Sequence, residues 1–562
     1  MRKLGRQQHI FSRDSTGLVR EINTHQAFIY NFMAIGLCTF TWVTLYSIAY
    51  SQSFLGSNIG IAILLMTLAS IPFYLCTSML SSAMPRSGGD YVWQSRVLHP
   101  AVGFASTFSA WTVWQWYFAS FLGVVITTIG FQPYFALLGQ SNSYLSALAG
   151  SLAADYGFNT PVFWITTAII LLGFLIAAAG MKFYVRLQYF LFAGSAASSL
   201  TMLYVLATTS HSAFVSSFNR FTFPLVQAQG NGTLTSAVQA AGGYYEYIVN
   251  SASVNVPAFS WGSTLALMAI IWVSFGYAFW SIYNLSEIKR AGSLRTHTWT
   301  QVGSSLLFAV FLLALWYLLE NVMGLKFLDS FYTLFYSYNP STNPIAFFYT
   351  PYYPALTASI STSPWVWGII LGGLTFGIFQ VILIVYFAST RIMLASSIDR
   401  VLPEKISYVN SRTHSPLIAL AISAVGCEAF LYVIIYHTSI TSYFSTAGLA
   451  TQIAYVMISL TAIVFPFRKK EVFNSSPIAK YRLGRVPLLS LLGVIALLVN
   501  LYIGYVFIAG PSFTGITVPT QTSIEFVFGI FIACLVVYLI AWGARKGQGI
   551  DLSLAFGEIP PE

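Results

Sequence analysis

The chain has 562 residues, of which 7% are charged, 56% are hydrophobic and 17% are aromatic. Soluble globular domains carry about 25% charged residues, because their surface has to be solvated. This composition excludes a soluble domain of any size and indicates a surface that is covered by lipid. A net charge of +10 is compatible with nucleic-acid binding or with membrane topology, and the distribution of the basic residues along the chain distinguishes the two.

Apolar runs of about 20 residues, long enough to cross a hydrocarbon core of about 30 Å, recur along the whole chain. A polar N-terminal segment, 1–26, precedes the first of them, and this run is too long for a cleaved signal. We predict an all-α integral membrane protein with 12 spans, at 27–49, 57–80, 102–130, 162–180, 187–208, 262–284, 303–323, 366–390, 416–436, 444–466, 487–509 and 524–543.

The basic residues follow these spans. Of the 26 lysines and arginines, 24 fall on the side of the two termini, and only Arg220 and Lys326 fall on the other. Basic residues mark the cytoplasmic side, so we predict a multi-pass protein of the cytoplasmic membrane with both termini, including the tail 544–562, in the cytoplasm. The basic excess is thus explained by topology, and no nucleic-acid partner is expected.

Two long segments, 209–261 and 324–364, are predicted as extracellular loops. They are nearly uncharged and rich in Ser, Thr, Tyr, Asn and Pro. Loops of this length often form lids. Asn231 begins a glycosylation sequon in the first loop, and the sequence leaves its use open. A charge-poor outer face also suits an acidic exterior.

The loop after the second span carries a specific motif. It reads Ala-Met-Pro-Arg-Ser-Gly-Gly-Asp-Tyr-Val-Trp over 83–93, followed by Ser95-Arg96 and His99-Pro100. This motif closely resembles the cytoplasmic signature of amino acid permeases of the amino acid–polyamine–organocation superfamily. Three further segments agree with the family in order and spacing: 20–22 before span 1, as in archaeal-type members, 284–290 after span 6, and 391–403 with Ser415-Pro416 after span 8.

The resemblance implies a LeuT-like core of two inverted five-helix repeats, 27–208 and 262–466, with helices 11 and 12 (467–543) appended. In such folds the first helix of each repeat is broken at the bilayer midplane, and the freed backbone groups face a cavity. Half-helix ends then offer N–H groups to a carboxylate and carbonyls to an ammonium group. The substrate implied is an amino acid or a related small amine, with no cofactor.

By this resemblance, span 1 would bind the substrate carboxylate at Ile35, Gly36, Leu37, Cys38 and Thr39. Cys38 stands where the family usually has a second glycine. Cysteine permits neither the close approach nor the positive φ that glycine allows. The site is therefore narrower, or the substrate lacks an ordinary carboxylate. An unbroken apolar helix is the alternative from the residues alone.

In span 6 the expected break is Gly276, with the ammonium group received near Ser274 and Phe275. The rings of Tyr277 and Phe279 are candidates for the wall of the cavity, and so is Trp114 in span 3. Each of these rings could equally serve packing. Many relatives have an acidic residue close to Tyr277, where this chain has Ala278.

Two residues are candidates for coupling to an ion. Glu428 is the only carboxylate in the middle of a predicted span. Two roles are open for its side chain: a proton relay, or a structural hydrogen bond in the protonated form. Thr375 in span 8 is a weak candidate for sodium. Some relatives use a lysine in span 5 for proton coupling. Span 5 of this chain has no lysine, so that mechanism is not expected here.

The cytoplasmic gate is expected near the signature motif and the ends of spans 6 and 8. Its candidate residues are Arg86, Gly88, Gly89, Asp90, Glu287 and Arg391. Loop packing and topology explain the same residues, so both interpretations stay open.

The function predicted is secondary active transport by alternating access, driven by protons or by exchange. The alternatives are a carrier of the same fold for another organic solute, and a nutrient receptor that has lost transport. An enzyme is not expected, because no nucleophile, paired-carboxylate or metal-ligand set has suitable spacing.

Overall fold

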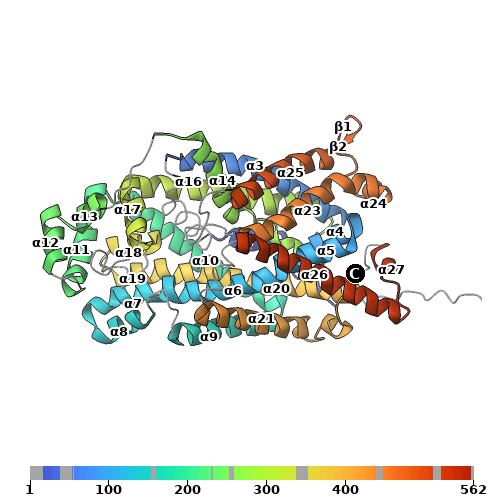
Figure 1. Ribbon diagram of the computed structural model, residues 1–562, viewed down its shortest axis with the longest axis horizontal. Coiled ribbons are helices and arrows are strands. Elements are labelled where there is room, and N and C mark those ends of the chain that lie inside the picture. The colour runs from blue at the N-terminus through green and yellow to red at the C-terminus, as the bar shows by residue number, and fades with distance from the viewer. Residues whose placement is uncertain are drawn as a thin grey trace, which may run out of the picture.

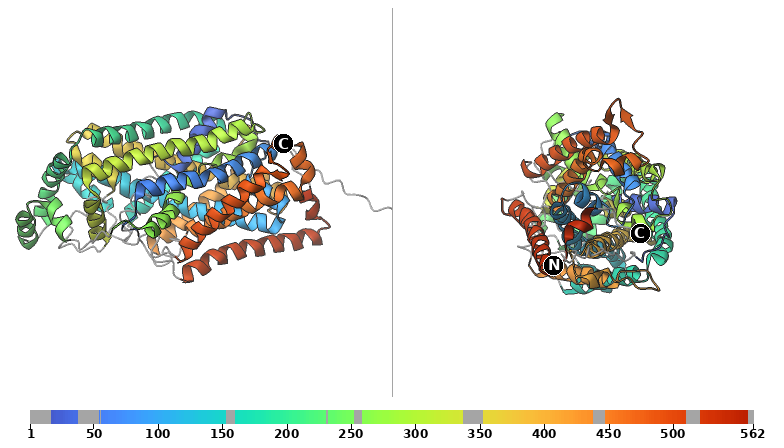
Figure 2. Two further views of the ribbon diagram at one scale, coloured as in Figure 1. Left: turned by 90° about the horizontal axis from the view of Figure 1, so that it is seen from above. Right: turned by 90° about the vertical axis from the view of Figure 1, so that its right-hand side faces the viewer.

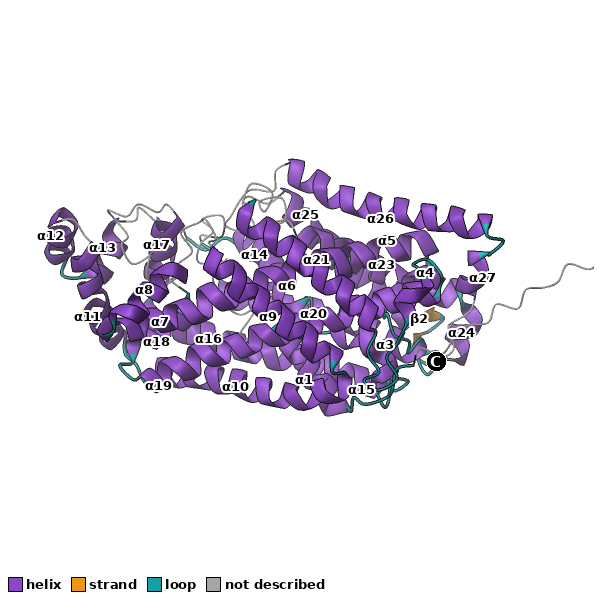
Figure 3. Ribbon diagram, turned by 90° about the horizontal axis from the view of Figure 1, so that it is seen from below, coloured by secondary structure: helices purple, strands orange, loops and turns teal. Residues whose placement is uncertain are grey.

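The computed structural model describes residues 17–37, 54, 56–152, 160–229, 232–251, 258–336, 352–437, 447–509 and 521–557. Cys38, Thr39 and Asn231 lie outside these residues, so the predictions made for them are not addressed by the structure. Figure 3 shows that the described chain is almost entirely helical. Its one sheet is the hairpin of β1 (Arg482–Leu483) and β2 (Val486–Pro487).

The elements up to the middle of the chain are α1 (Thr24–Ile35), α3 (Ile59–Ala83), α4 (Asp90–Val97), α5 (Pro100–Phe108), η2 (Ser109–Val113), α6 (Trp114–Val125), η3 (Ile126–Phe131), α7 (Gln132–Leu138), η4 (Gly139–Ser141), α8 (Ser143–Leu152), α9 (Thr160–Ala178), α10 (Met181–Ala207), α11 (His211–Gln229), α12 (Gly232–Ala241) and α13 (Tyr244–Ser251).

The second half contains α14 (Trp261–Phe275), η5 (Trp280–Glu287), α15 (Leu294–Thr298), η6 (Trp299–Gly303), α16 (Ser304–Met323), α17 (Leu325–Tyr336), α18 (Tyr353–Ile360), α19 (Pro364–Trp367), η8 (Gly368–Gly372), α20 (Gly373–Ile398), η9 (Glu404–Ser407), α21 (Leu417–Tyr436), α23 (Ala447–Arg468), α24 (Lys470–Ser475), α25 (Leu488–Ala509), α26 (Gln521–Gly547) and α27 (Leu552–Gly557).

Eleven segments of the described chain are long and apolar enough to cross a membrane. They coincide with predicted spans 2 to 12, although several segments are longer than predicted. The segment at predicted span 3 extends from Pro100 to Ser141, and the segment at predicted span 8 extends from Pro364 to Ile398. The predicted first span is described only as far as Leu37. The all-helical, multi-span class is therefore confirmed, whereas the count of 12 stays a prediction.

The long helices lie side by side along one axis of the molecule (Figures 1 and 2). In Figure 1, α11, α12 and α13 lie at one end of the bundle, and α4, α24, α27 and the hairpin lie at the other, which we call the α4 end. Charged groups that are buried in ion pairs gather on α4, η5 and α20.

The segments predicted as extracellular loops contain helices. Phe214 and Phe218 on α11 and Phe327 and Phe331 on α17 are four residues apart, so each pair lies on one face of its helix. The rings meet with centroids 5.1–5.7 Å apart. Aromatic residues at helical spacing therefore outweigh the loop-like composition of these segments. We call α11, α13 and α17 the helical cap.

Asp329 is buried in the helical cap, with 4% of its surface exposed. Burial raises the pKa of Asp329 to about 7, whereas an unfolded Asp titrates near 3.9. A folded state that prefers the protonated form is most stable in acid and loses that stability as the pH rises through 7. We expect amide exchange over 325–336, corrected for its intrinsic rate, to be faster at pH 8 than at pH 5. Asp329→Asn should remove most of this difference, and an unchanged difference would contradict the assignment.

Candidate functional site

The sixth predicted span is interrupted at Gly276. Helix α14 ends at Phe275, residues 276–279 form turns, and the 3₁₀ helix η5 begins at Trp280. The Tyr455 hydroxyl of α23 donates a hydrogen bond of 2.9 Å to the carbonyl of Gly276. A Cβ atom on residue 276 would lie 2.6 Å from this hydroxyl oxygen, so glycine is what permits the contact. The break exposes backbone groups, and Tyr455 satisfies one of them.

Helix α1 ends at Ile35, and Gly36 adopts a left-handed conformation with φ 80° and ψ 79°. Asn31 joins α1 to η5, because its Oδ1 accepts a hydrogen bond of 2.8 Å from the backbone N–H of Ser281. Its Nδ2 donates to the carbonyl of Thr300 at 3.1 Å. The ends of α1 and α14 thus stand where the resemblance implies breaks, and α1 and η5 are tied together.

A cavity of about 70 Å³ lies beside the break in α14. It is lined by residues from α6, α14, α23 and α25, namely Trp114, Gln115, Phe118, Trp272, Val273, Tyr277, Gly448, Thr451, Tyr455 and Phe507. Six of these ten residues are aromatic, and none carries a formal charge. The wall is apolar with a few neutral hydrogen-bonding groups, an arrangement typical of small-molecule sites.

The polar groups of the cavity converge on Tyr277. Its hydroxyl interacts with the side chains of Gln115 and Thr451, and its ring lies 6.4 Å from that of Trp111. The Trp111 ring in turn lies 5.4 Å from the ring of Tyr455. Tyr277 and Tyr455 are therefore held between the cavity and a layer of packed rings behind it.

Of the predicted substrate-binding residues, the structure places Trp114 and Tyr277 in the cavity wall. Gly276 lies behind the wall, bonded to Tyr455. Phe275 and Phe279 are instead packed, against Phe308 and Phe73 respectively. Ser274 and the described residues of span 1, Ile35, Gly36 and Leu37, are buried outside this lining.

Sequence reasoning missed Gln115, Thr451 and Tyr455. Tyr455 lies 179 residues after Gly276, and it is one of 34 tyrosines in the chain. No local pattern distinguishes it from a packing residue. Gln115 and Thr451 are uncharged polar residues within predicted spans, a signal that is detectable but common.

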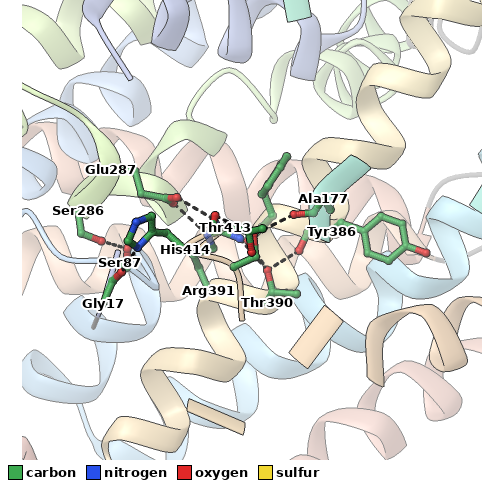
Figure 4. A network of polar contacts seen from close by, with 12 residues as sticks. Gly17, Ser87, Ala177, Ser286, Glu287, Tyr386, Thr390, Arg391, Thr413 and His414 are labelled. Carbon is green, nitrogen blue, oxygen red and sulfur yellow. Dashed lines mark hydrogen bonds and ion pairs between the residues drawn. The ribbon is translucent and has the colours of Figure 1, made fainter. Parts of the chain in front are cut away.

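A buried ion pair joins η5 to α20. Arg391 donates from Nη2 to Glu287 Oε1 at 2.8 Å and from Nε to Glu287 Oε2 at 3.0 Å, and both side chains are almost fully buried. Figure 4 shows this pair, with Thr390 next to it. The Thr390 hydroxyl accepts from Arg391 Nη1 at 3.1 Å and donates to the Tyr386 carbonyl. This bidentate, desolvated geometry is that of a strong charge-assisted contact.

The signature glycines let the loop approach the same two helices. Gly89 has φ 50°, and a Cβ atom there would lie 2.6 Å from Ile282 Cγ1 on η5. Gly88 has φ 88°, and its Cβ would lie 2.7 Å from the Cβ of Ala395 on α20. The adjacent Ser87 hydroxyl bonds to that of Ser286 (Figure 4). Glycine at both positions is thus required by the backbone and by the space.

A second buried ion pair joins α4 to the end of α20. Arg96 Nη2 lies 2.7 Å from Asp399 Oδ1, and the Tyr91 hydroxyl donates to Asp399 Oδ2 at 2.9 Å. Sequence reasoning quoted these residues as part of the motifs without assigning them a role. Arg86, predicted with the gate, has its guanidinium 3.4 Å from the Pro85 carbonyl and does not take part in either pair.

The candidate coupling residues lie apart from the cavity lining. Glu428 on α21 accepts a hydrogen bond of 2.9 Å from Thr167 on α9. The Thr375 hydroxyl donates to the Gly372 carbonyl of its own helix at 2.7 Å. Neither residue is among those that line the cavity.

A family model described as "Amino acid permease" matches residues 27–537, which is most of the chain. No curated protein matches the sequence. The matched region contains α14, the cavity and both buried ion pairs. The chain therefore belongs to the amino acid permease family, whose members are multi-span membrane transporters and not enzymes.

Proposed function

We propose that this permease carries amino acids, or related small amines, across the cytoplasmic membrane by alternating access. The observation that carries this proposal is a neutral cavity beside an interrupted helix, in a bundle that has two buried ion pairs on α4, η5 and the end of α20. Alternating access requires a substrate site that is closed toward one side of the membrane, and the two buried ion pairs and the cavity at the helix break support this proposal.

The cavity lining favours a substrate with an apolar side chain. A cationic or acidic side chain would have to leave water for a wall that offers no opposite charge, which costs several kcal/mol. The α-ammonium and α-carboxylate groups differ, because neutral hydrogen-bonding side chains of the wall, such as Gln115 and Thr451, can meet them. We therefore assign the site to neutral amino acids of the aliphatic or aromatic kind.

Topology completes the proposal. We assign the α4 end to the cytoplasm, with both termini on that side, because 24 of the 26 basic residues fall there in the predicted topology. The core is then the 12-span, archaeal-type arrangement with two inverted repeats. Protons or a counter-substrate supply the driving force.

Reconstitution in liposomes tests the function. We expect saturable counterflow of labelled leucine or phenylalanine, abolished by a tenfold excess of the other neutral amino acid and little affected by arginine or glutamate. Binding without counterflow would favour a receptor. Counterflow of an amine or organic acid in place of any amino acid would favour a carrier of another solute.

A further inference from the structure

Asp90 is a buried carboxylate that belongs to neither ion pair. It begins α4, between the second and third spans, and its side chain is 0% exposed. Oδ2 accepts hydrogen bonds from Trp111 Nε1 at 2.9 Å and from Gln94 Nε2 at 3.0 Å. Oδ1 has no hydrogen-bond partner among the described residues. One oxygen of this carboxylate is thus free to carry a proton.

The neighbouring carboxylates are different. Glu287 is paired with Arg391, and Asp399 is paired with Arg96. Within the described chain, no cation forms an ion pair with Asp90, although it is as deeply buried as they are. A buried carboxylate without a cation favours its neutral form. Burial raises the pKa of Asp90 to about 7, and the neighbouring Trp111 N–H, Tyr283 hydroxyl and backbone N–H groups of Asp90 and Tyr91 oppose this rise only in part.

Other titratable and charged groups stand around Asp90 without neutralising it. Tyr283 of η5 interacts with the carboxylate but makes no hydrogen bond of ordinary geometry. The remaining charges on the elements packed against α4 are engaged elsewhere, in the two ion pairs or on backbone groups. These groups are Arg96 on α4, His99 after it, Glu287 on η5, Arg391 on α20, Asp399 directly after α20, and Tyr455 and Arg468 on α23.

Asp90 is connected to the cavity through one residue. Its partner Trp111 lies in η2, a π-helical segment of the third span, and such irregular segments are common at functional sites. The Trp111 ring contacts the rings of Tyr277 and Tyr455, with centroids 6.4 Å and 5.4 Å apart. Both tyrosines line the cavity. A change at Asp90 therefore reaches the cavity wall through Trp111.

We propose that Asp90 is the proton-binding site of this transporter, and that loading a proton on its free oxygen loosens Trp111 and the contact of α4 with η5. The ionised carboxylate holds Trp111 and Gln94 by charge-assisted hydrogen bonds, and protonation removes that charge and weakens both. Only a proton is exchanged in this step. The inference rests on the proposed function, and it assigns to Asp90 the coupling that sequence reasoning sought at Glu428.

The test distinguishes proton coupling from substrate transport as such. Uptake of labelled leucine or phenylalanine into proteoliposomes is measured twice, as counterflow at equal pH and as accumulation driven by an inward proton gradient. We expect Asp90→Asn to lower gradient-driven accumulation at least tenfold relative to counterflow, and Asp90→Glu to restore it. Glu428→Gln, the matched carboxylate control, should leave the ratio unchanged. Asp90→Asn with an unchanged ratio, or a loss in Glu428→Gln instead, overturns the proposal.

Trp111→Phe provides an independent readout if Asp90→Asn does not fold. This change removes an N–H group that stabilises the ionised carboxylate, so the pH of half-maximal gradient-driven uptake should move upward. A merely structural role for Asp90 predicts a lower rate with an unchanged midpoint. If the wild-type protein shows counterflow but no response to the proton gradient, proton coupling at Asp90 is refuted and the proposed transport function is retained. If the wild-type protein shows no counterflow, the proposed function itself is refuted.

Discussion

Arg391→Met is expected to lower the free energy of unfolding by about 3–5 kcal/mol, because it leaves Glu287 as an uncompensated buried charge. The two side chains are 0% and 1% exposed, so water cannot replace the lost partner. Unfolding by increasing fractions of SDS in mixed micelles, followed by circular dichroism, measures the change.

The matched controls separate the charge from the packing. Arg391→Met combined with Glu287→Met should recover much of the loss, because replacing a whole buried pair with apolar residues is often neutral or stabilising. Glu404→Gln removes an exposed pair with Arg400, 3.7 Å long, and should change stability by less than about 1 kcal/mol. Equal losses in Arg391→Met and Glu404→Gln would show that the buried pair contributes nothing special.

Gly276→Ala is expected to lower the rate of substrate uptake by roughly 5- to 150-fold. The new Cβ would lie 2.6 Å from the Tyr455 hydroxyl oxygen and 3.0 Å from the Trp272 carbonyl oxygen. Overpacking of this kind costs about 1–3 kcal/mol, which corresponds to that range of rates if the strain falls on the transport step. Initial rates of counterflow in proteoliposomes measure it.

A second glycine of the same helix provides the control. A Cβ on Gly262 would meet nothing closer than 3.8 Å, so Gly262→Ala should transport normally. Tyr455→Phe keeps the ring and removes the hydrogen bond to Gly276, and it should give a smaller loss than Gly276→Ala. If Gly276→Ala and Gly262→Ala behave alike, the close approach of Tyr455 does not limit transport.

Much of the fold can be predicted from the sequence because lipid imposes simple rules. Spans are marked by their length and lack of charge, and predicted spans 2 to 12 each coincide with a candidate span of the structure. The composition of 209–261 and 324–364 does not reveal the helices α11, α13 and α17 that these segments contain, and their extracellular position stays a prediction. The signal was present in Phe214 and Phe218, and in Phe327 and Phe331, at helical spacing.

The candidate site is predictable only where it depends on local backbone. Gly276 stands at the end of α14 because it permits a close approach, and the signature glycines permit contact with η5 and α20. The partners of these residues, such as Tyr455 for Gly276 and Trp111 for Asp90, come from helices that only the packed bundle brings together. Their residue types are common throughout the chain, which has 34 tyrosines and 14 tryptophans.

The chain ahead of α1 is attached to the segment after η5 by two backbone hydrogen bonds, from Ile22 N to the Glu287 carbonyl at 2.8 Å and from Lys289 N to the Ile22 carbonyl at 2.9 Å. Each such bond contributes about 0.5–1.5 kcal/mol. Glu287 thus joins two contacts, because its backbone carbonyl accepts from Ile22 while its carboxylate pairs with Arg391 on α20. Since Ile22 is itself buried, a displacement of the chain ahead of α1 acts directly on the residue that forms the buried ion pair.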